Sequence, residues 1–160
     1  MKSTENQHDL WRTVVEAHDA YIAGRVLFLK LDHQRKLEVL RQALLSPAER
    51  AVALEIIAAC LNEEDKKALF PELLRLASLA HGHTGNARNI LLTLPFSWIT
   101  ANVQAPLDNI LRSADSMEYG QLLHLFEKID TNLASRLAER ALLSADPEIR
   151  REGNEFLAER

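Results

Sequence analysis

Few residues in this chain have the types and spacing that chemistry requires. His81 and His83 flank Gly82, and a His-x-His pair can supply two metal ligands. A structural or catalytic metal site needs three or four ligands, and no Cys or carboxylate lies close in the sequence to complete the set. We interpret this segment as a polar loop between helices, and we predict neither a metal site nor a cofactor.

The other candidates for catalysis have plainer explanations. Cys60 lies in an apolar run with no His or cationic residue close in the sequence to activate its thiol, which favours a buried, inert cysteine. Carboxylates are plentiful, but most fall near predicted helix N-termini, where they complement the helix dipole. The sequence contains no glycine-rich phosphate loop and no nucleophile motif. We therefore expect no catalytic residues and no enzymatic activity.

The segment 94–102 is the strongest candidate for binding. Pro95, Phe96 and Trp98 interrupt the helical pattern there, and we expect the stretch 96–105 to be the least regular of the chain. Aromatic side chains are favoured at the energetic centres of protein interfaces. The alternative interpretation is that Phe96 and Trp98 fill a junction between two helical units.

The composition limits the class of protein. The chain has 160 residues, of which 47% are hydrophobic, enough for the core of one domain. With 19 basic and 23 acidic residues, the net charge of −4 makes nucleic acid an unlikely partner. No apolar run is long enough to span a membrane, and the first ten residues have no apolar secretory segment. A single Cys suits a reducing compartment, so we predict a cytoplasmic protein without a membrane partner.

Helical spacing of apolar residues runs through most of the chain. It predicts a helix over 6–21, a break at Gly24 and a short helix over 25–31, which together form an atypical N-terminal helix pair within residues 1–32. Asp32 and Asn62 are predicted N-caps, and either Asp130 or Thr131 is predicted to cap the helix over 132–143. Ser46-Pro47 and Asp146-Pro147 are two further predicted helix starts of the cap-plus-proline type.

These helices suggest an internal repeat of about 33 residues. Steps of 33 connect four large apolar residues, Ile57, Ile90, Leu123 and Phe156. A second series is mostly small: Leu54, Ala87, Gly120 and Gly153. A third series is Leu44, Ala77, Ile110 and Leu143. Such a pattern is typical of helix pairs that stack on one another and share a continuous core, with the small residues where helices approach closely.

The stretch from Ala141 to Leu157 resembles a HEAT repeat. It has a Leu-rich end of a first helix, an Asp-Pro turn, and the apolar-Arg pair Ile149-Arg150 that opens a second helix. Residues 44–57 form a weaker copy, while Met117 and Thr84 stand where Arg150 would recur. The resemblance covers roughly residues 33–160. It implies an all-α fold, a right-handed α-α superhelix of about four helix pairs in a single domain over 1–160, and no particular activity.

We therefore predict a non-catalytic protein-binding module that uses the polar face of its second helices. Candidate partner-binding residues are Phe96, Trp98, Arg88, His124 and Arg151. A specific form of the prediction is a bacterial immunity protein that neutralises a basic toxin or enzyme, to which the net charge of −4 would be attracted. Two alternatives stay open: a nucleic-acid-acting protein resembling the HEAT-like alkylpurine DNA glycosylases, and a chaperone-type or lyase-type adaptor that holds a cofactor-bearing protein.

Overall fold

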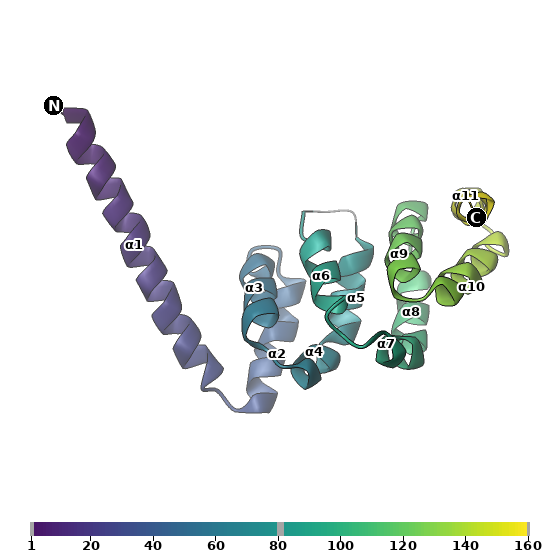
Figure 1. Cartoon of the computed structure of the whole chain (residues 1–160), viewed down its shortest axis with the longest axis horizontal. Coiled ribbons are helices and arrows are strands. Elements are labelled where there is room, and N and C mark those ends of the chain that lie inside the picture. Colours follow the sequence, from purple (N-terminus) through teal and green to yellow (C-terminus); the bar gives the residue numbers. More distant parts are fainter. Residues whose placement is uncertain (1, 80–81, 160) are drawn as a thin grey trace. The chain divides into compact units, whose positions relative to one another are not determined.

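The computed structural model describes residues 2–79 and 82–159, and for residues 2–6 the backbone alone. Within these ranges every regular element is an α-helix and no strand occurs, which confirms the predicted all-α class (Figure 1). His81 of the predicted interhelix loop lies outside the described residues. None of the helices in the described ranges combines the length and the apolar character that a membrane crossing requires.

Eleven helices are found within the described ranges. They are α1 (Lys2–Leu29), α2 (His33–Leu45), α3 (Arg50–Cys60), α4 (Glu63–Ala68), α5 (Phe70–Ser78), α6 (Thr84–Leu91), α7 (Phe96–Asn102), α8 (Gln104–Leu111), α9 (Ser116–Ile129), α10 (Thr131–Leu142) and α11 (Pro147–Ala158). The chain forms two compact units, residues 1–40 and 41–160, with the boundary inside α2. Each unit is described by itself below.

The N-terminal unit is dominated by α1, which runs through Gly24 without a break. The prediction of two helices within residues 1–32 was therefore wrong. A glycine inside a helix costs only about 1 kcal/mol relative to alanine, and Ala20 and Ala23 beside it are strong helix formers. Gly24 does not adopt positive φ, so its backbone continues the helix.

Side-chain caps start most of the predicted helices. Asp32, Asn62 and Asp130 each accept a hydrogen bond from a backbone N–H of the following turn, at 2.8–2.9 Å. Asp146 does the same for Glu148, with Pro147 as the first residue of α11. At Ser46-Pro47 the prediction was wrong, because these two residues belong to a turn and α3 begins at Arg50.

The unit of residues 41–160 is built from helices that pack on their neighbours. Helix α5 packs on α6, and α10 on α11, so that each forms a pair. Helix α3 contacts α6 of the first pair. Helix α9 contacts α5 of the first pair and α11 of the second, and so connects the two pairs. In Figure 1 these helices follow one another from blue (α3) through teal and green to yellow (α11). The core between them is apolar and includes the fully buried side chains of Leu54, Leu73, Leu122 and Phe126.

Two of the three repeat series are buried throughout. Ile57, Ile90, Leu123 and Phe156 are at most 7% exposed, and the small series is buried as well. The third series is buried at Leu44, Ala77 and Ile110, but Leu143 is 87% exposed. Leu143 follows the last residue of α10 and turns away from the core, so the prediction that it repeats the burial of Leu44 was wrong.

Residues 96–102 form helix α7 rather than an irregular stretch. Pro95 stands immediately before the helix, where its missing N–H costs no helical hydrogen bond. Its carbonyl accepts bonds from the N–H groups of Trp98 and Ile99. The proline that suggested an interruption is therefore the start signal of a new helix.

Candidate protein-binding face

Four helices of the unit 41–160 each place one large apolar residue of the first repeat series in the core. These are α3, α6, α9 and α11, the helices that carry the buried residues Ile57, Ile90, Leu123 and Phe156. Because each of these residues points into the core, the residues on the other sides of the same helices face outward or line the spaces between helices. We call the surface formed by the exposed sides of α3, α6, α9 and α11 the second-helix face.

Arginines at the start of α3 and α11 hold these helices to the chain segments that precede them. Arg50 donates from Nε to the Leu44 carbonyl at 2.8 Å, and Arg150 donates from Nη1 to the carbonyls of Ser144 and Ala145 at 2.7 and 2.9 Å. Each arginine bonds carbonyls five or six residues before it, and the two arginines lie 100 residues apart in the chain. At α6 the Thr84 hydroxyl donates to the Leu79 carbonyl, so a shorter side chain bonds the equivalent carbonyl where the arginine is missing.

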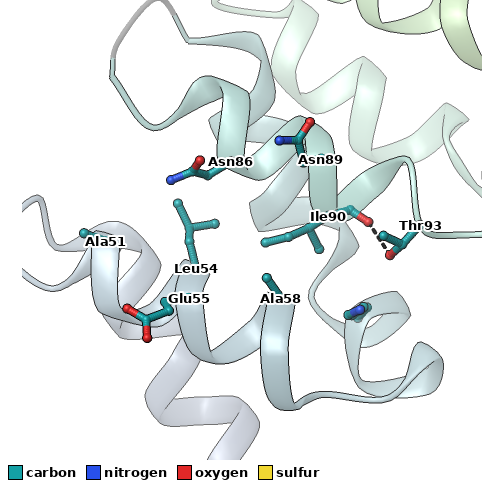
Figure 2. Close-up of a pocket in the computed structure, with 9 residues that line it drawn as sticks. Ala51, Leu54, Glu55, Ala58, Asn86, Asn89, Ile90 and Thr93 are labelled. Atoms are coloured by element: carbon teal, nitrogen blue, oxygen red, sulfur yellow. Dashed lines mark hydrogen bonds between the residues drawn. The ribbon is translucent and has the colours of Figure 1, made fainter. Parts of the chain in front are cut away.

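A hollow with a volume of about 550 Å³ lies between α3 and α6. Figure 2 shows Leu54 of α3 and Ile90 of α6 extending into the space between the two helices. Both side chains are almost fully buried and form an apolar floor. Asn86 and Asn89 of α6 line the exposed side of the hollow. A side-chain amide both donates and accepts hydrogen bonds, so this pair can match peptide groups of a bound chain.

A smaller hollow of about 200 Å³ between α6 and α9 brings together two predicted site residues, Arg88 and His124. His124 is exposed, but the Arg88 guanidinium is engaged within the chain. Its Nε donates to the Ala77 carbonyl at 3.2 Å, and Nη2 donates to the Gln121 carbonyl at 2.8 Å and to the Gln121 side chain. Burial lowers the pKa of Arg88, although a guanidinium stays charged at neutral pH. Arg88 thus joins α5, α6 and α9.

His124 also lines two hollows between α9 and α11, with volumes of about 80 and 260 Å³. Arg151, another predicted site residue, lines the larger one and is 57% exposed. Its guanidinium lies 2.7 Å from Glu148 and 3.6 Å from Glu155. The smaller hollow is bordered by three carboxylates, those of Glu152, Glu155 and Glu159. This end of the second-helix face is therefore rich in negative charge.

The predicted aromatic residues line none of these hollows. Trp98 of α7 is half-buried against Phe70 of α5, with ring centroids 5.3 Å apart and an interplanar angle of 88°. Lys67 Nζ lies 5.5 Å from the centroid of the Trp98 ring. Hydrogen bonds to Glu63 and Glu64 raise the pKa of Lys67, so it remains a cation over the ring. Phe96 lies two residues before Trp98 in the sequence, and its side chain is 42% exposed.

The structure adds residues that sequence reasoning did not select. Asn86 lines the hollow between α3 and α6, and Gly120 lines both hollows described between α9 and α11. Gly120 belongs to the series of small residues predicted where helices approach closely, and a Cβ there would lie 2.7 Å from the Glu152 side chain of α11. Within the described ranges no group of three or more His, Cys, Asp or Glu side chains could hold a metal ion. Cys60, expected to be buried, is half-exposed at the end of α3.

Comparison with known proteins finds no matching family model, no matching curated protein and no matching solved structure.

Proposed function

We propose that this protein is a HEAT-like α-solenoid that binds another protein through its second-helix face. The observation that carries the proposal is the series of hollows between α3 and α6, α6 and α9, and α9 and α11. Such hollows, on successive helices of one face, suit an extended surface of a partner rather than a single small molecule. The repeated burial of Ile57, Ile90, Leu123 and Phe156 supports the stacked arrangement.

The proposed partner contacts this face with basic side chains. Glu152, Glu155 and Glu159 border one hollow, and Arg151 offsets part of their charge through its pair with Glu155. An acidic hollow favours a basic protein segment and disfavours the phosphates of a nucleic acid. A basic toxin or enzyme neutralised by an immunity protein is one partner of this kind. The same charge argues against the glycosylase-like alternative.

A charge-reversal pair tests the proposal. A partner is first isolated on the immobilised full-length chain, and its dissociation constant is then measured with purified proteins. Glu155→Lys on α11 should raise the dissociation constant at least tenfold, because it places a cation where basic groups of the partner approach. Glu139→Lys, an exposed site on α10, makes the same charge change off this face and should leave the constant nearly unchanged.

Two results would contradict the proposed function. The first is an equal loss of affinity in Glu139→Lys, which would mean that only the net charge of the chain matters. The second is unchanged affinity in Glu155→Lys together with unchanged affinity in Asn89→Arg, which adds bulk at the hollows on either side of α6. Melting temperatures of all variants establish that the fold is retained.

A further inference from the structure

Another hollow of the unit 41–160 lies between the end of α2, the start of α3 and helix α5, and has a volume of about 350 Å³. Its apolar walls are formed by Leu44, Leu45, Pro71, Leu76 and Leu79. Leu44 and Leu76 are buried and form the floor, whereas Leu45 is 71% exposed. We call this space the α2–α5 hollow. It shares no lining residue with the hollows of the second-helix face.

Two opposite charges on α5 line the α2–α5 hollow. Glu72 and Arg75 lie one turn apart on this helix, and each is held by a different partner. Glu72 Oε1 lies 3.5 Å from Arg41 Nε, and Arg75 Nη2 lies 3.4 Å from Glu118 Oε1. The third charged lining residue, Arg50, is engaged with carbonyls of the chain before it. The two α5 side chains therefore determine the polar chemistry of the hollow.

Each of these two side chains keeps one polar atom unsatisfied. Glu72 Oε2 and Arg75 Nη1 are buried, and neither has a hydrogen-bond partner within the described residues. The oxygen requires a donor and the nitrogen requires an acceptor. Most buried polar atoms of folded proteins are hydrogen-bonded, because leaving them unpaired costs free energy. A guest that supplies both a donor and an acceptor at this place therefore gains affinity.

A peptide group has the required combination. Its N–H donates and its C=O accepts, and it carries no charge that either Glu72 or Arg75 would repel. A water molecule also donates and accepts, but it leaves the exposed Leu45 uncovered, whereas an aliphatic side chain beside the peptide group removes apolar surface from water. The Glu72 and Arg75 side chains are 23% and 40% exposed, so their terminal groups have room to turn toward the hollow.

We propose that the α2–α5 hollow binds an extended segment of a partner protein through one aliphatic residue of the leucine type. The aliphatic side chain packs on Leu44, Leu45 and Leu76, the N–H of the same residue donates to Glu72 Oε2, and a neighbouring carbonyl accepts from Arg75 Nη1. A volume of about 350 Å³ lies at the lower end of the range for ligand pockets, which suits one side chain with its peptide groups. This site is independent of the second-helix face.

Binding of the capped peptide acetyl-Ala-Leu-Ala-amide to the full chain tests the site. In a titration followed by proton–nitrogen correlation spectra, we expect saturable shifts at the backbone amides of Leu45, Glu72 and Leu79. The peptide acetyl-Ala-Ala-Ala-amide should bind at least about tenfold more weakly, because it lacks the aliphatic group that fills the hollow.

Two serine substitutions test the apolar wall. Leu45→Ser should weaken binding of the leucine peptide about tenfold, because it removes the apolar surface that the guest covers. Leu143→Ser is the matched control, since Leu143 is 87% exposed and lines none of the hollows described above. It should leave the dissociation constant within a factor of about two. Both side chains are exposed, so the fold should tolerate both changes.

An ester analogue tests the hydrogen bond to Glu72. In this analogue an ester oxygen replaces the leucine N–H, so the guest loses its donor but keeps its shape. The wild-type chain should bind the ester about tenfold more weakly than the peptide, and Glu72→Ala should bind both within a factor of about two. Arg75→Met, which removes the donor to the guest carbonyl, should weaken binding of both ligands alike. Melting temperatures show whether the variants keep their fold.

Three results would overturn this inference. The first is the absence of a saturable shift with the leucine peptide up to its solubility limit. The second is a set of shifts confined to the second-helix face, for example at Asn89, which would place the peptide elsewhere. The third is equal affinity of the wild-type chain for the peptide and its ester, which would mean that Glu72 accepts no bond from the guest.

Discussion

Helices α1 and α9 both carry many apolar residues, but the environments of these residues differ. Helix α9 has 14 residues and buries seven of them, including Leu122 and Phe126. Helix α1 is twice as long, and its side chains from Gln7 onward are exposed or half-exposed. The difference teaches that similar apolar residues are covered by neighbouring helices in residues 41–160, whereas those of α1 are not buried by the helices of their own unit.

The largest effect should come from emptying the core beside α9. Phe126→Ala removes a fully buried ring and should lower the free energy of unfolding by about 3–5 kcal/mol, measured by urea denaturation. Trp11→Ala in α1 replaces a side chain that is 64% exposed and should change it by no more than about 0.5 kcal/mol. A large loss in Trp11→Ala would mean that α1 is already covered within one chain.

Alanine substitutions at two glycines extend the comparison. The substitution at Gly153 should give the next largest loss of stability. A Cβ on Gly153 of α11 would lie 2.7 Å from the Ala138 carbonyl oxygen and 2.7 Å from the Ala141 Cβ. Because the α10 backbone cannot yield as a flexible side chain does, Gly153→Ala should destabilise the protein by about 1–3 kcal/mol in thermal unfolding. Unchanged stability would show that α10 and α11 do not approach so closely.

Tyr119 ties α9 to α10 through a buried hydrogen bond to the Leu137 carbonyl at 2.8 Å. Tyr119→Phe should cost about 1 kcal/mol at neutral pH. Burial raises the pKa of Tyr119 from 10.0 to about 12, so folding favours the neutral phenol. The wild-type chain should therefore lose stability relative to Tyr119→Phe as the pH rises from about 10 to about 12. Denaturation of both proteins across this range measures the difference, and parallel curves would contradict it.

The smallest effect is expected at the second glycine, Gly24 of α1. A Cβ there meets no atom within 4 Å, and the residue already has helical backbone angles. Gly24→Ala should therefore stabilise α1 by about 0.5–1 kcal/mol, seen as increased helicity by circular dichroism on heating. Reduced helicity would indicate that the glycine is required for a bend or a close contact.

Local signals in the sequence predicted much of the fold. Asp32, Asn62, Asp130 and Asp146 begin helices as expected, because an N-cap is decided by the residue and its next turn. The burial of the series through Ile57 and Ile90 could be predicted from its period alone. The helix break predicted at Gly24 was wrong, because the free-energy cost of one glycine is smaller than the stability that a long helix gains from its other residues.

The candidate site was less accessible to sequence reasoning. Arg88 was expected to face a partner, but its guanidinium bonds the carbonyls of Ala77 and Gln121. These contacts depend on how α5, α6 and α9 pack, which the local sequence does not specify. His124 and Arg151 were expected on one face, and they line a common hollow. The hollow between α3 and α6 depends on how closely two helices pack, which no local pattern specifies. The partner-binding role of these residues remains a prediction.

Hydrogen–deuterium exchange of the full chain tests the contrast between the two regions most directly. Amides of α9 and α10 should be protected, because their apolar faces are closed within residues 41–160. Amides of α1 should exchange faster than those of α9 and α10, because no side chain of α1 from Gln7 onward is buried. Protection of α1 as strong as that of α9 would contradict the claim that the two regions differ in how their apolar side chains are covered.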